Sequence, residues 1–394
     1  MTDATQTELL SRSFATPTAR VSDRRRWLFG PTIDFLILGG GSAVALALAA
    51  WLLPSGISAS QQVVYVTVVM TLINQPHFAY SYQIFYRNFR AKAFGAEYPR
   101  PLRLRYLVAG IVVPILLIAF LAVGVFSAFI EGQPRVLSYG ANVMFFMVGW
   151  HYVKQGYGIL IVDSVQKRLF FSSAAKTILR ANGYACWMVA WVSLNHVLAA
   201  AVSYSGVTYY TLPIPAAIYY AAIAAAATTT LAMIGALVVQ WHKMRTLPWN
   251  GVGGYLATLY LWVVFVRISP MFLLLVPTFH SLQYLAVVWR YQLNAGRSAA
   301  PSRFKMEALD RIWPDGTWRR LAIFVGVGVV LGFLGFVALP YLLDASLSYD
   351  RSAFGQTLFV FLFYIFINVH HYFLDNVMWR RGNPDIQRHV FGAP

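Results

Sequence analysis

The chain has 394 residues, of which 58% are hydrophobic and 11% are charged, and its mean hydropathy is +0.58. Because soluble domains carry about a quarter charged residues, this composition excludes an ordinary soluble enzyme. Lys and Arg outnumber Asp and Glu by 31 to 14, which gives a net charge of +17. The single cysteine, Cys186, excludes an intrachain disulfide framework and any zinc or iron–sulfur site built from cysteines. The sequence therefore indicates a polytopic membrane protein.

The polar N-terminal segment, about residues 1–30, lacks the apolar stretch of a cleavable signal peptide and predicts a cytoplasmic tail. Ten apolar segments follow, with lengths close to the roughly 20 residues that cross a bilayer. They cover about 33–53, 63–86, 106–129, 138–162, 179–203, 212–240, 252–266, 270–290, 321–343 and 354–379. They predict an all-α transmembrane helical bundle over residues 31–381, followed by a cytoplasmic tail over 382–394.

Basic residues concentrate in alternate connections between these segments. They precede the first predicted helix and follow the second, fourth, sixth, eighth and tenth, whereas connections 54–62 and 204–211 carry no charge. Cytoplasmic loops carry an excess of Lys and Arg, so the alternation predicts ten spans with both termini in the cytoplasm. We expect a bacterial inner-membrane location. The same placement explains the basic charge without a nucleic-acid partner.

Two further features concern packing and the loops. Gly328 and Gly332 are four residues apart in the ninth predicted helix, a spacing that favours close packing against another helix. Segment 291–320 is the one sizeable cytoplasmic connection, and we expect a short amphipathic surface helix within it. It is too short to form a separate domain.

Five of the eight histidines lie in predicted spans that run from the outer to the cytoplasmic side: His77, His151, His280, His370 and His371. His77, His280 and His370 each lie ten residues before an arginine that follows an aromatic residue, a pairing typical of the membrane interface. At 1.5 Å per residue, ten residues place them about 15 Å inside that interface, near the bilayer midplane. His151 belongs to the same layer.

Four helices that deliver imidazoles to one depth indicate a metal site, because neutral imidazole is a common ligand of iron, copper and zinc. His370 or His371 is the expected fourth ligand. The structural alternative is that each histidine only forms a hydrogen bond with a neighbouring helix.

Other polar residues lie one turn from these histidines. Asp375 follows His371 by four residues and can orient its ring or bind the metal directly. Lys154 needs a counter-ion within the bundle, and Asp375 and Asp34 are at suitable depths. Tyr80 and Ser81 lie one turn below His77. We expect catalytic roles for Asp375, Lys154 and Tyr80, and positions around the ligands for Gln155, Gln283 and Tyr284.

The pair Pro76-His77 within one helix, and the aromatic–histidine element Trp150-His151-Tyr152, carry a resemblance to a known family. They resemble elements of the membrane β-carotene dioxygenases of the bacteriorhodopsin-related-protein family and, more loosely, the histidine-rich membrane non-haem iron oxygenases. The resemblance covers scattered residues on about half of the chain and implies iron bound by histidines and reaction with dioxygen, not a carotene substrate specifically. The pair His370-His371 and the ten predicted spans depart from that family.

The sequence thus predicts a membrane non-haem iron oxygenase or oxidase in which His77, His151, His280 and His370 or His371 bind Fe(II). Its expected substrate is lipophilic, such as an isoprenoid, a carotenoid or an acyl chain, and membrane lipids surround it. Because no nucleotide-binding or flavin motif is present, a reductant must come from a membrane redox or complex partner.

Other readings remain open at the sequence level. One is a transporter or a non-catalytic subunit of a membrane complex, in which the histidines form a proton or ion relay with Lys154, Asp375 and Asp34. Another is a haem b electron-transfer protein. A transition metal other than iron is a third possibility.

Overall fold

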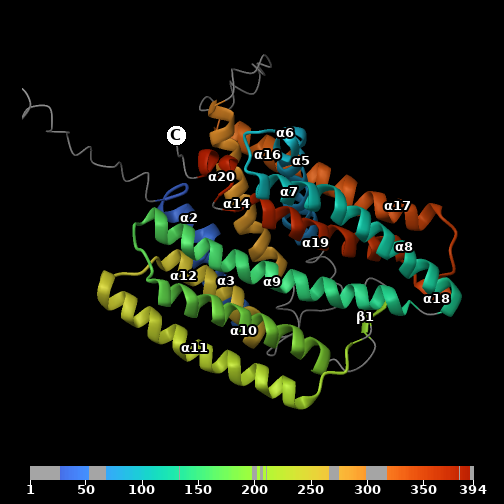
Figure 1. Cartoon of the computed structure of the whole chain (residues 1–394), viewed down its shortest axis with the longest axis horizontal. Helices are drawn as coiled ribbons and strands as arrows, with labels where there is room; N and C mark the ends of the chain where they lie inside the picture. Colours follow the sequence, from blue (N-terminus) through green and yellow to red (C-terminus); the bar gives the residue numbers. More distant parts are fainter. Residues whose placement is uncertain are drawn as a thin grey trace, which may run out of the picture.

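The computed structural model describes residues 27–52, 68–132, 134–197, 202–204, 207–209, 211–265, 275–298, 317–380 and 382–390. Nearly all of these residues lie in helices (Figure 1). The predicted amphipathic helix of segment 291–320 falls largely outside the described residues, as does most of the predicted N-terminal tail.

The N-terminal half forms α2 (Pro31–Leu38), α3 (Gly40–Leu52), η3 (Met70–Asn74), α5 (Gln75–Tyr86), α6 (Phe89–Phe94), α7 (Arg100–Leu107), η4 (Val108–Val112), α8 (Val113–Glu131), α9 (Arg135–Gln166) and α10 (Ser173–Val197). The η segments are π-helical turns that continue into the neighbouring α-helices. A short antiparallel hairpin follows, with β1 (Val202–Tyr204) paired to β2 (Val207–Tyr209). The hairpin was not predicted, since the fifth predicted helix was extended to residue 203.

The C-terminal half contains α11 (Ala216–Met244), α12 (Trp249–Tyr260), η5 (Leu261–Phe265), α14 (Leu275–Ser298), α16 (Thr317–Phe333), η7 (Leu334–Ala338), α17 (Leu339–Ser346), α18 (Arg351–Phe354), α19 (Leu358–Met378) and α20 (Pro384–His389). Each of the ten predicted ranges overlaps a described helix. The structure therefore confirms the helical fold class.

Four helical runs are long and apolar enough to cross a membrane: Arg100–Glu131, Ala216–Met244, Arg319–Ser346 and Leu358–Met378. Their side chains include large apolar groups that are mostly exposed, such as Phe129 and Leu231, which are 75% and 71% exposed. Soluble proteins rarely expose apolar surface so extensively. The described helices therefore indicate a membrane protein.

Helix α9 runs through the middle of the bundle and packs against α8, α10, α12 and α19 (Figure 1). Helix α11 packs on α10, and α16 packs on α5. This arrangement surrounds the central parts of α5, α9, α14 and α19 with protein. Their inward faces carry buried polar side chains, among them His77, His280 and Asp375.

The predicted small-residue face of α16 is confirmed by its contact with α5. A Cβ at Gly332 would lie 2.7 Å from the main-chain carbon of Gln75, and one at Gly328 would lie 2.7 Å from the ring of Tyr80. A Cβ at Gly326 would meet no atom within 4 Å. The two close-packed glycines therefore set the distance between α16 and α5, the helix that carries His77.

Candidate metal centre

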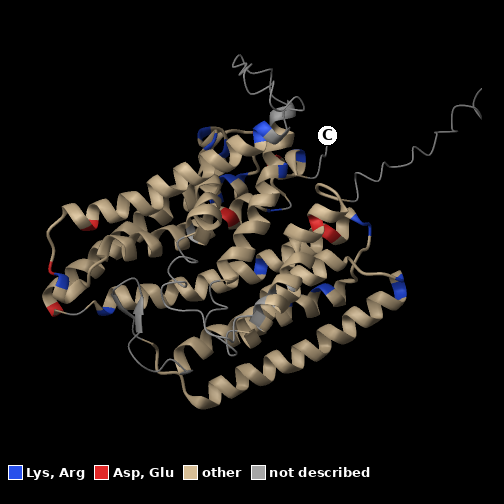
Figure 2. Cartoon of the chain, turned by 180° about the vertical axis from the view of Figure 1, so that it is seen from behind, with Lys and Arg blue, Asp and Glu red and all other residues tan. Residues whose placement is uncertain are grey.

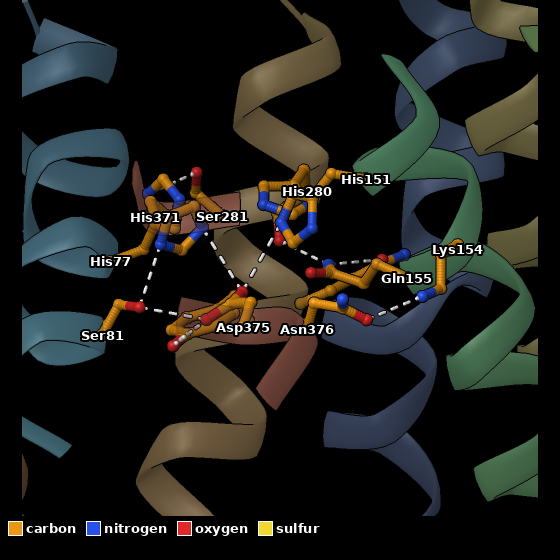
Figure 3. A network of polar contacts seen from close by, with 12 residues as sticks. His77, Ser81, His151, Lys154, Gln155, His280, Ser281, His371, Asp375 and Asn376 are labelled. Carbon is orange, nitrogen blue, oxygen red and sulfur yellow. Dashed lines mark hydrogen bonds and ion pairs between the residues drawn. The ribbon is translucent and has the colours of Figure 1, made fainter. Parts of the chain in front are cut away.

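Four histidines from four helices surround one point in the bundle (Figure 3). They are His77 on α5, His151 on α9, His280 on α14 and His371 on α19, and each is at most 8% exposed. Going around the cluster, the ring centroids of His77 and His371 are 4.7 Å apart, those of His371 and His151 5.1 Å, those of His151 and His280 4.7 Å, and those of His280 and His77 5.3 Å. The centroids of His280 and His371, on opposite sides, are 6.4 Å apart. The structure thus brings together one histidine from each of the four predicted helices.

Asp375 lies at the same cluster, one helical turn after His371. Its Oδ2 is 3.3 Å from Nε2 of His371 and 3.5 Å from Nε2 of His151. Its Oδ1 accepts hydrogen bonds from the hydroxyls of Ser81 and Tyr284, both at 3.0 Å. One carboxylate oxygen is therefore held by the protein, and the other faces the histidines.

The hydrogen bonds of Ser81 determine which nitrogen of His371 carries the proton. Ser81 donates its only hydroxyl hydrogen to Asp375, so it accepts the hydrogen bond from Nδ1 of His371, which is 2.9 Å away. A neutral His371 protonated on Nδ1 has its lone pair on Nε2. With Asp375 ionised, this lone pair faces Oδ2, and two acceptors meet with no hydrogen between them.

Several buried polar atoms in the cluster have no hydrogen-bond partner within the described part of the chain. They are Nε2 of His151, both ring nitrogens of His280, Nε2 of His371 and Oδ2 of Asp375. An unsatisfied buried polar group costs about 1–3 kcal/mol, and such groups are uncommon in native proteins. A cluster of such groups at one point could bind a cation.

The cluster provides two overlapping sets of three ligands whose donor atoms lie within 4.8 Å of one another. The first is His77, His280 and His371, and the second is His151, His371 and Asp375. Because Nδ1 of His371 is protonated, its one lone pair can bind only one ion. Both sets therefore describe parts of a single site.

The ring of His77 is also oriented by its neighbours. Its Nδ1 contacts the main-chain oxygen of Asn74 and lies 3.0 Å from the hydroxyl of Ser281. A ring N–H that donates to a carbonyl leaves Nε2 as the ligand atom, the usual arrangement for metal-binding histidines.

The spacing and chemistry of these residues fit a transition metal. With metal–nitrogen bonds of about 2.1 Å, two imidazoles on one ion hold their ring centroids about 4.5–6.5 Å apart. The five separations given above range from 4.7 to 6.4 Å. Imidazole and carboxylate ligands suit iron, zinc, copper and manganese better than calcium or magnesium.

Two glutamines expected near the ligands act on the main chain around His280. Gln155 donates to the main-chain oxygen of His280 at 2.8 Å and contacts Oε1 of Gln283 at 3.3 Å. Gln283 in turn donates to the main-chain oxygen of Leu38 at 3.0 Å. They connect α9, α14 and α2, whereas Tyr284, the third residue of the predicted set, contacts the Asp375 carboxylate directly.

His370 lies outside the cluster although it neighbours His371. Its Nδ1 is 2.8 Å from the hydroxyl of Tyr82, and its Nε2 is 3.0 Å from the main-chain oxygen of Ala109. Both nitrogens are therefore used by partners away from the cluster. Of the two histidines left open by the sequence, His371 is the one beside Asp375.

Lys154 and Tyr80 also point elsewhere. The Lys154 ammonium donates to Oδ1 of Asn376 at 3.1 Å and lies 4.2 Å from the ring centroid of Trp150. Within the described residues, Lys154 does not form the expected ion pair with Asp375 or Asp34. Asp34 instead accepts hydrogen bonds from the main-chain N–H groups of residues 28 and 29. Tyr80 donates to the main-chain oxygen of Phe324 on α16 and stacks on that ring.

Sequence reasoning placed Ser81 one turn below His77, among the residues around the ligands, but gave no role to Asn74 or Ser281. Ser81 is four residues after His77, so the two share a helix face, and that spacing is a usable signal. Asn74 and Ser281 contact His77 from the preceding turn and from another helix. Because Ser281 lies on a different helix from His77, no local sequence pattern predicts its contact with His77.

Comparison with known proteins yields no match: no family model, curated protein or solved structure is significantly similar to this chain. These comparisons neither support nor refute the resemblance of Pro76-His77 and Trp150-His151-Tyr152 to membrane β-carotene dioxygenases. The function is therefore inferred from the geometry of the cluster.

Proposed function

We propose that this chain is an integral-membrane non-haem iron oxygenase or oxidase that acts on a lipophilic substrate. The ligands are His77, His151, His280, His371 and Asp375. The observation that carries the proposal is the convergence of unpartnered buried polar atoms from His151, His280, His371 and Asp375 at one point between four helices.

A membrane topology of ten spans, with both termini in the cytoplasm of a bacterium, is part of this proposal. It is supported by the alternation of basic and base-poor connections along the sequence. In this topology the histidines lie near the bilayer midplane. Molecules dissolved in the bilayer, such as isoprenoids, carotenoids or acyl chains, reach this depth more readily than water-soluble ones.

Iron is favoured because histidine and carboxylate together form the usual ligand set of non-haem Fe(II) oxygenases. Bound Fe(II) would supply the reaction with dioxygen. The chain supplies the arrangement of the ligands: Ser81 and Tyr284 hold Asp375, and Ser81 also directs Nε2 of His371 into the site. Burial of all five ligands excludes bulk water.

A haem does not fit the same residues. The axial ligands of a haem lie on opposite faces of a flat macrocycle, which needs the space between them to be free. His280 and His371 lie opposite each other, but His77 and His151 occupy the positions between them. The cluster therefore favours a single bare ion over a porphyrin.

Elemental analysis of detergent-purified protein tests the proposal. We expect about one transition-metal ion per chain in the wild type, and iron when the protein is produced in iron-replete cells. The variants His151→Ala, His280→Ala and His371→Ala should each lose most of the metal. His370→Ala provides a matched control, because it removes an adjacent histidine that lies outside the cluster and should retain the metal.

Two results would contradict the proposal. One is a folded wild-type protein that contains no transition metal and takes up none when Fe(II) is added without oxygen; a proton or ion relay predicts this result. The other is a His371→Ala variant that binds metal as the wild type does. An absorption spectrum with a haem Soret band would equally exclude the site proposed here.

A further inference from the structure

An open apolar groove lies between α11 and α12, on helices that carry none of the proposed ligands. It has a volume of about 410 Å³. The buried side chains of Met233 and Val252 line it, and Trp241 and Trp249, which are 49% and 56% exposed, lie at one end. Because α11 is long and apolar enough to cross a membrane and is mostly exposed, the groove faces the lipid.

The length of the groove matches one leaflet of a bilayer. It extends from Trp241 to Thr230 along α11 and from Trp249 to Tyr260 along α12, which is about 16 Å at 1.5 Å per residue. Half of a hydrocarbon core of about 30 Å is about 15 Å. At the deep end, the hydroxyls of Thr230 and Tyr260 are 2.7 Å apart and satisfy each other. The groove therefore has the length and the apolar lining for one acyl chain.

The end with the tryptophans is positively charged. Lys243 in the last turn of α11 and Arg245 just after it are exposed, and within the described part of the chain neither forms an ion pair. Basic residues are visible at this end of α11 in Figure 2. The start of α10, with Lys176 and Arg180, lies at the same end, because Gln240 on α11 donates to Ser172 at 3.1 Å. Residues 164–306 include no Asp or Glu at all. The nearest carboxylate at this end, Asp163 on α9, is buried, pairs with Lys167 at 2.8 Å and accepts a hydrogen bond from the main chain of Gly251, so its charge is already paired.

We propose that this groove binds an anionic phospholipid, with one acyl chain between α11 and α12 and the phosphate at Lys243 and Arg245. Tryptophans are enriched at the level of lipid headgroups, which suits Trp241 and Trp249 at the charged end. Residues 164–306 provide no carboxylate for a choline or ethanolamine group, and Asp163 is buried and paired with Lys167, so the site favours an anionic lipid over a zwitterionic one. The site is separate from the proposed metal centre and does not depend on it.

Native mass spectrometry of delipidated protein in detergent tests this site. Phosphatidylglycerol and phosphatidylcholine with identical acyl chains are added separately, and bound lipids are counted. We expect the wild type to retain phosphatidylglycerol in preference. Because a cation near a membrane surface contributes about 1 kcal/mol, the variants Lys243→Gln and Arg245→Gln should each weaken phosphatidylglycerol binding about fivefold. The variants Arg100→Gln and Arg320→Gln remove charge elsewhere and should bind as the wild type does.

A second pair of variants tests the acyl-chain part of the site. Leu237→Trp fills the groove and should abolish retention of the lipid. Leu231→Trp makes the same change at a 71% exposed position of the same helix outside the groove and should not. The metal content of all these variants should equal that of the wild type, which keeps this test independent of the metal centre.

The proposal is overturned if the wild type binds the two lipids equally or if the Leu237→Trp variant retains phosphatidylglycerol. If inorganic phosphate displaces phosphatidylglycerol at an equal concentration, the groove is a simple anion site that binds no acyl chain, and the proposal is again overturned. Dimers that Leu237→Trp abolishes would show that a second copy of the chain occupies the groove, which also overturns the proposal.

Discussion

Replacing Asp375 by asparagine separates the proposed metal centre from an ordinary buried hydrogen-bond network. In an Asp375→Asn variant the remaining oxygen can still accept from Ser81 and Tyr284, as Oδ1 does now. The new amide NH₂ takes the place of Oδ2, which lies 3.3 Å from Nε2 of His371 and 3.5 Å from Nε2 of His151. For an ionised Asp375, the substitution therefore turns a contact between two acceptors into a hydrogen bond and removes a buried negative charge.

The effect on stability should change sign with the metal. Without metal, an unsatisfied buried polar group costs about 1–3 kcal/mol, so we expect the free energy of unfolding of the variant to exceed that of the wild type by about this amount. With metal at a thousand times its dissociation constant, the wild type gains about 4.1 kcal/mol. The variant lacks one ligand and should gain much less. The wild type is then the more stable protein only when metal is present.

Thermal unfolding in detergent, followed by tryptophan fluorescence, measures both conditions: once with a chelator and once with Fe(II) in the absence of oxygen. Asp344→Asn is the matched control. Both oxygens of Asp344 accept hydrogen bonds. Oδ1 accepts from the Tyr349 hydroxyl and the main chain of Phe359, and Oδ2 accepts from the main chain of Val360. An amide in place of either oxygen should therefore destabilise the protein in both conditions. An Asp375→Asn variant that is less stable than the wild type in chelator would refute the reasoning.

Two further changes test the surroundings of the site. Ser81→Ala removes the acceptor that holds Nδ1 of His371, so metal affinity measured against a competing chelator should fall about 10–100-fold. Ser81→Thr keeps a hydroxyl and should partly restore the affinity. Unchanged affinity in the alanine variant would show that Ser81 does not orient the ring. Gly332→Ala places a methyl group against the main chain of Gln75 and should lower the free energy of unfolding by about 1–3 kcal/mol. Gly326→Ala is the control: its added methyl group would meet no atom within 4 Å, so the free energy of unfolding should not fall in this way. Equal melting temperatures for the two glycine variants would contradict the close packing of α16 on α5.

The helical fold was predictable because it follows from the apolar segments, and every predicted range overlaps a described helix. The number of membrane-crossing helices is harder to predict. Helix α9 is 32 residues long, yet it includes Lys154 and Asp163 and is not among the helices apolar enough to qualify by composition. A helix in the middle of a bundle faces protein on several sides, so it can carry polar residues that a lipid-facing helix cannot. Ten spans therefore stay a prediction.

The partners of individual polar side chains were less predictable, because depth and helix assignment leave their direction open. Lys154 and Asp375 are at similar depths, which suggested an ion pair, but Lys154 contacts Asn376 and Asp375 faces the histidines. Adjacent residues on a helix point about 100° apart, so neighbours such as Asp375 and Asn376 meet different surroundings.

The same rule explains why the sequence left His370 and His371 unresolved. The ten-residue distance to the arginine at the interface selects His370 by depth, but the two histidines differ in depth by only about 1.5 Å. Their directions differ far more. His371 lies four residues before Asp375 and therefore on the same helix face, which turns it toward Ser81 and the cluster. His370 points toward Tyr82 and the main chain of Ala109, so both its nitrogens are occupied. For a histidine within a bundle, spacing relative to a carboxylate on the same helix is therefore the more informative signal, since it fixes direction as well as depth.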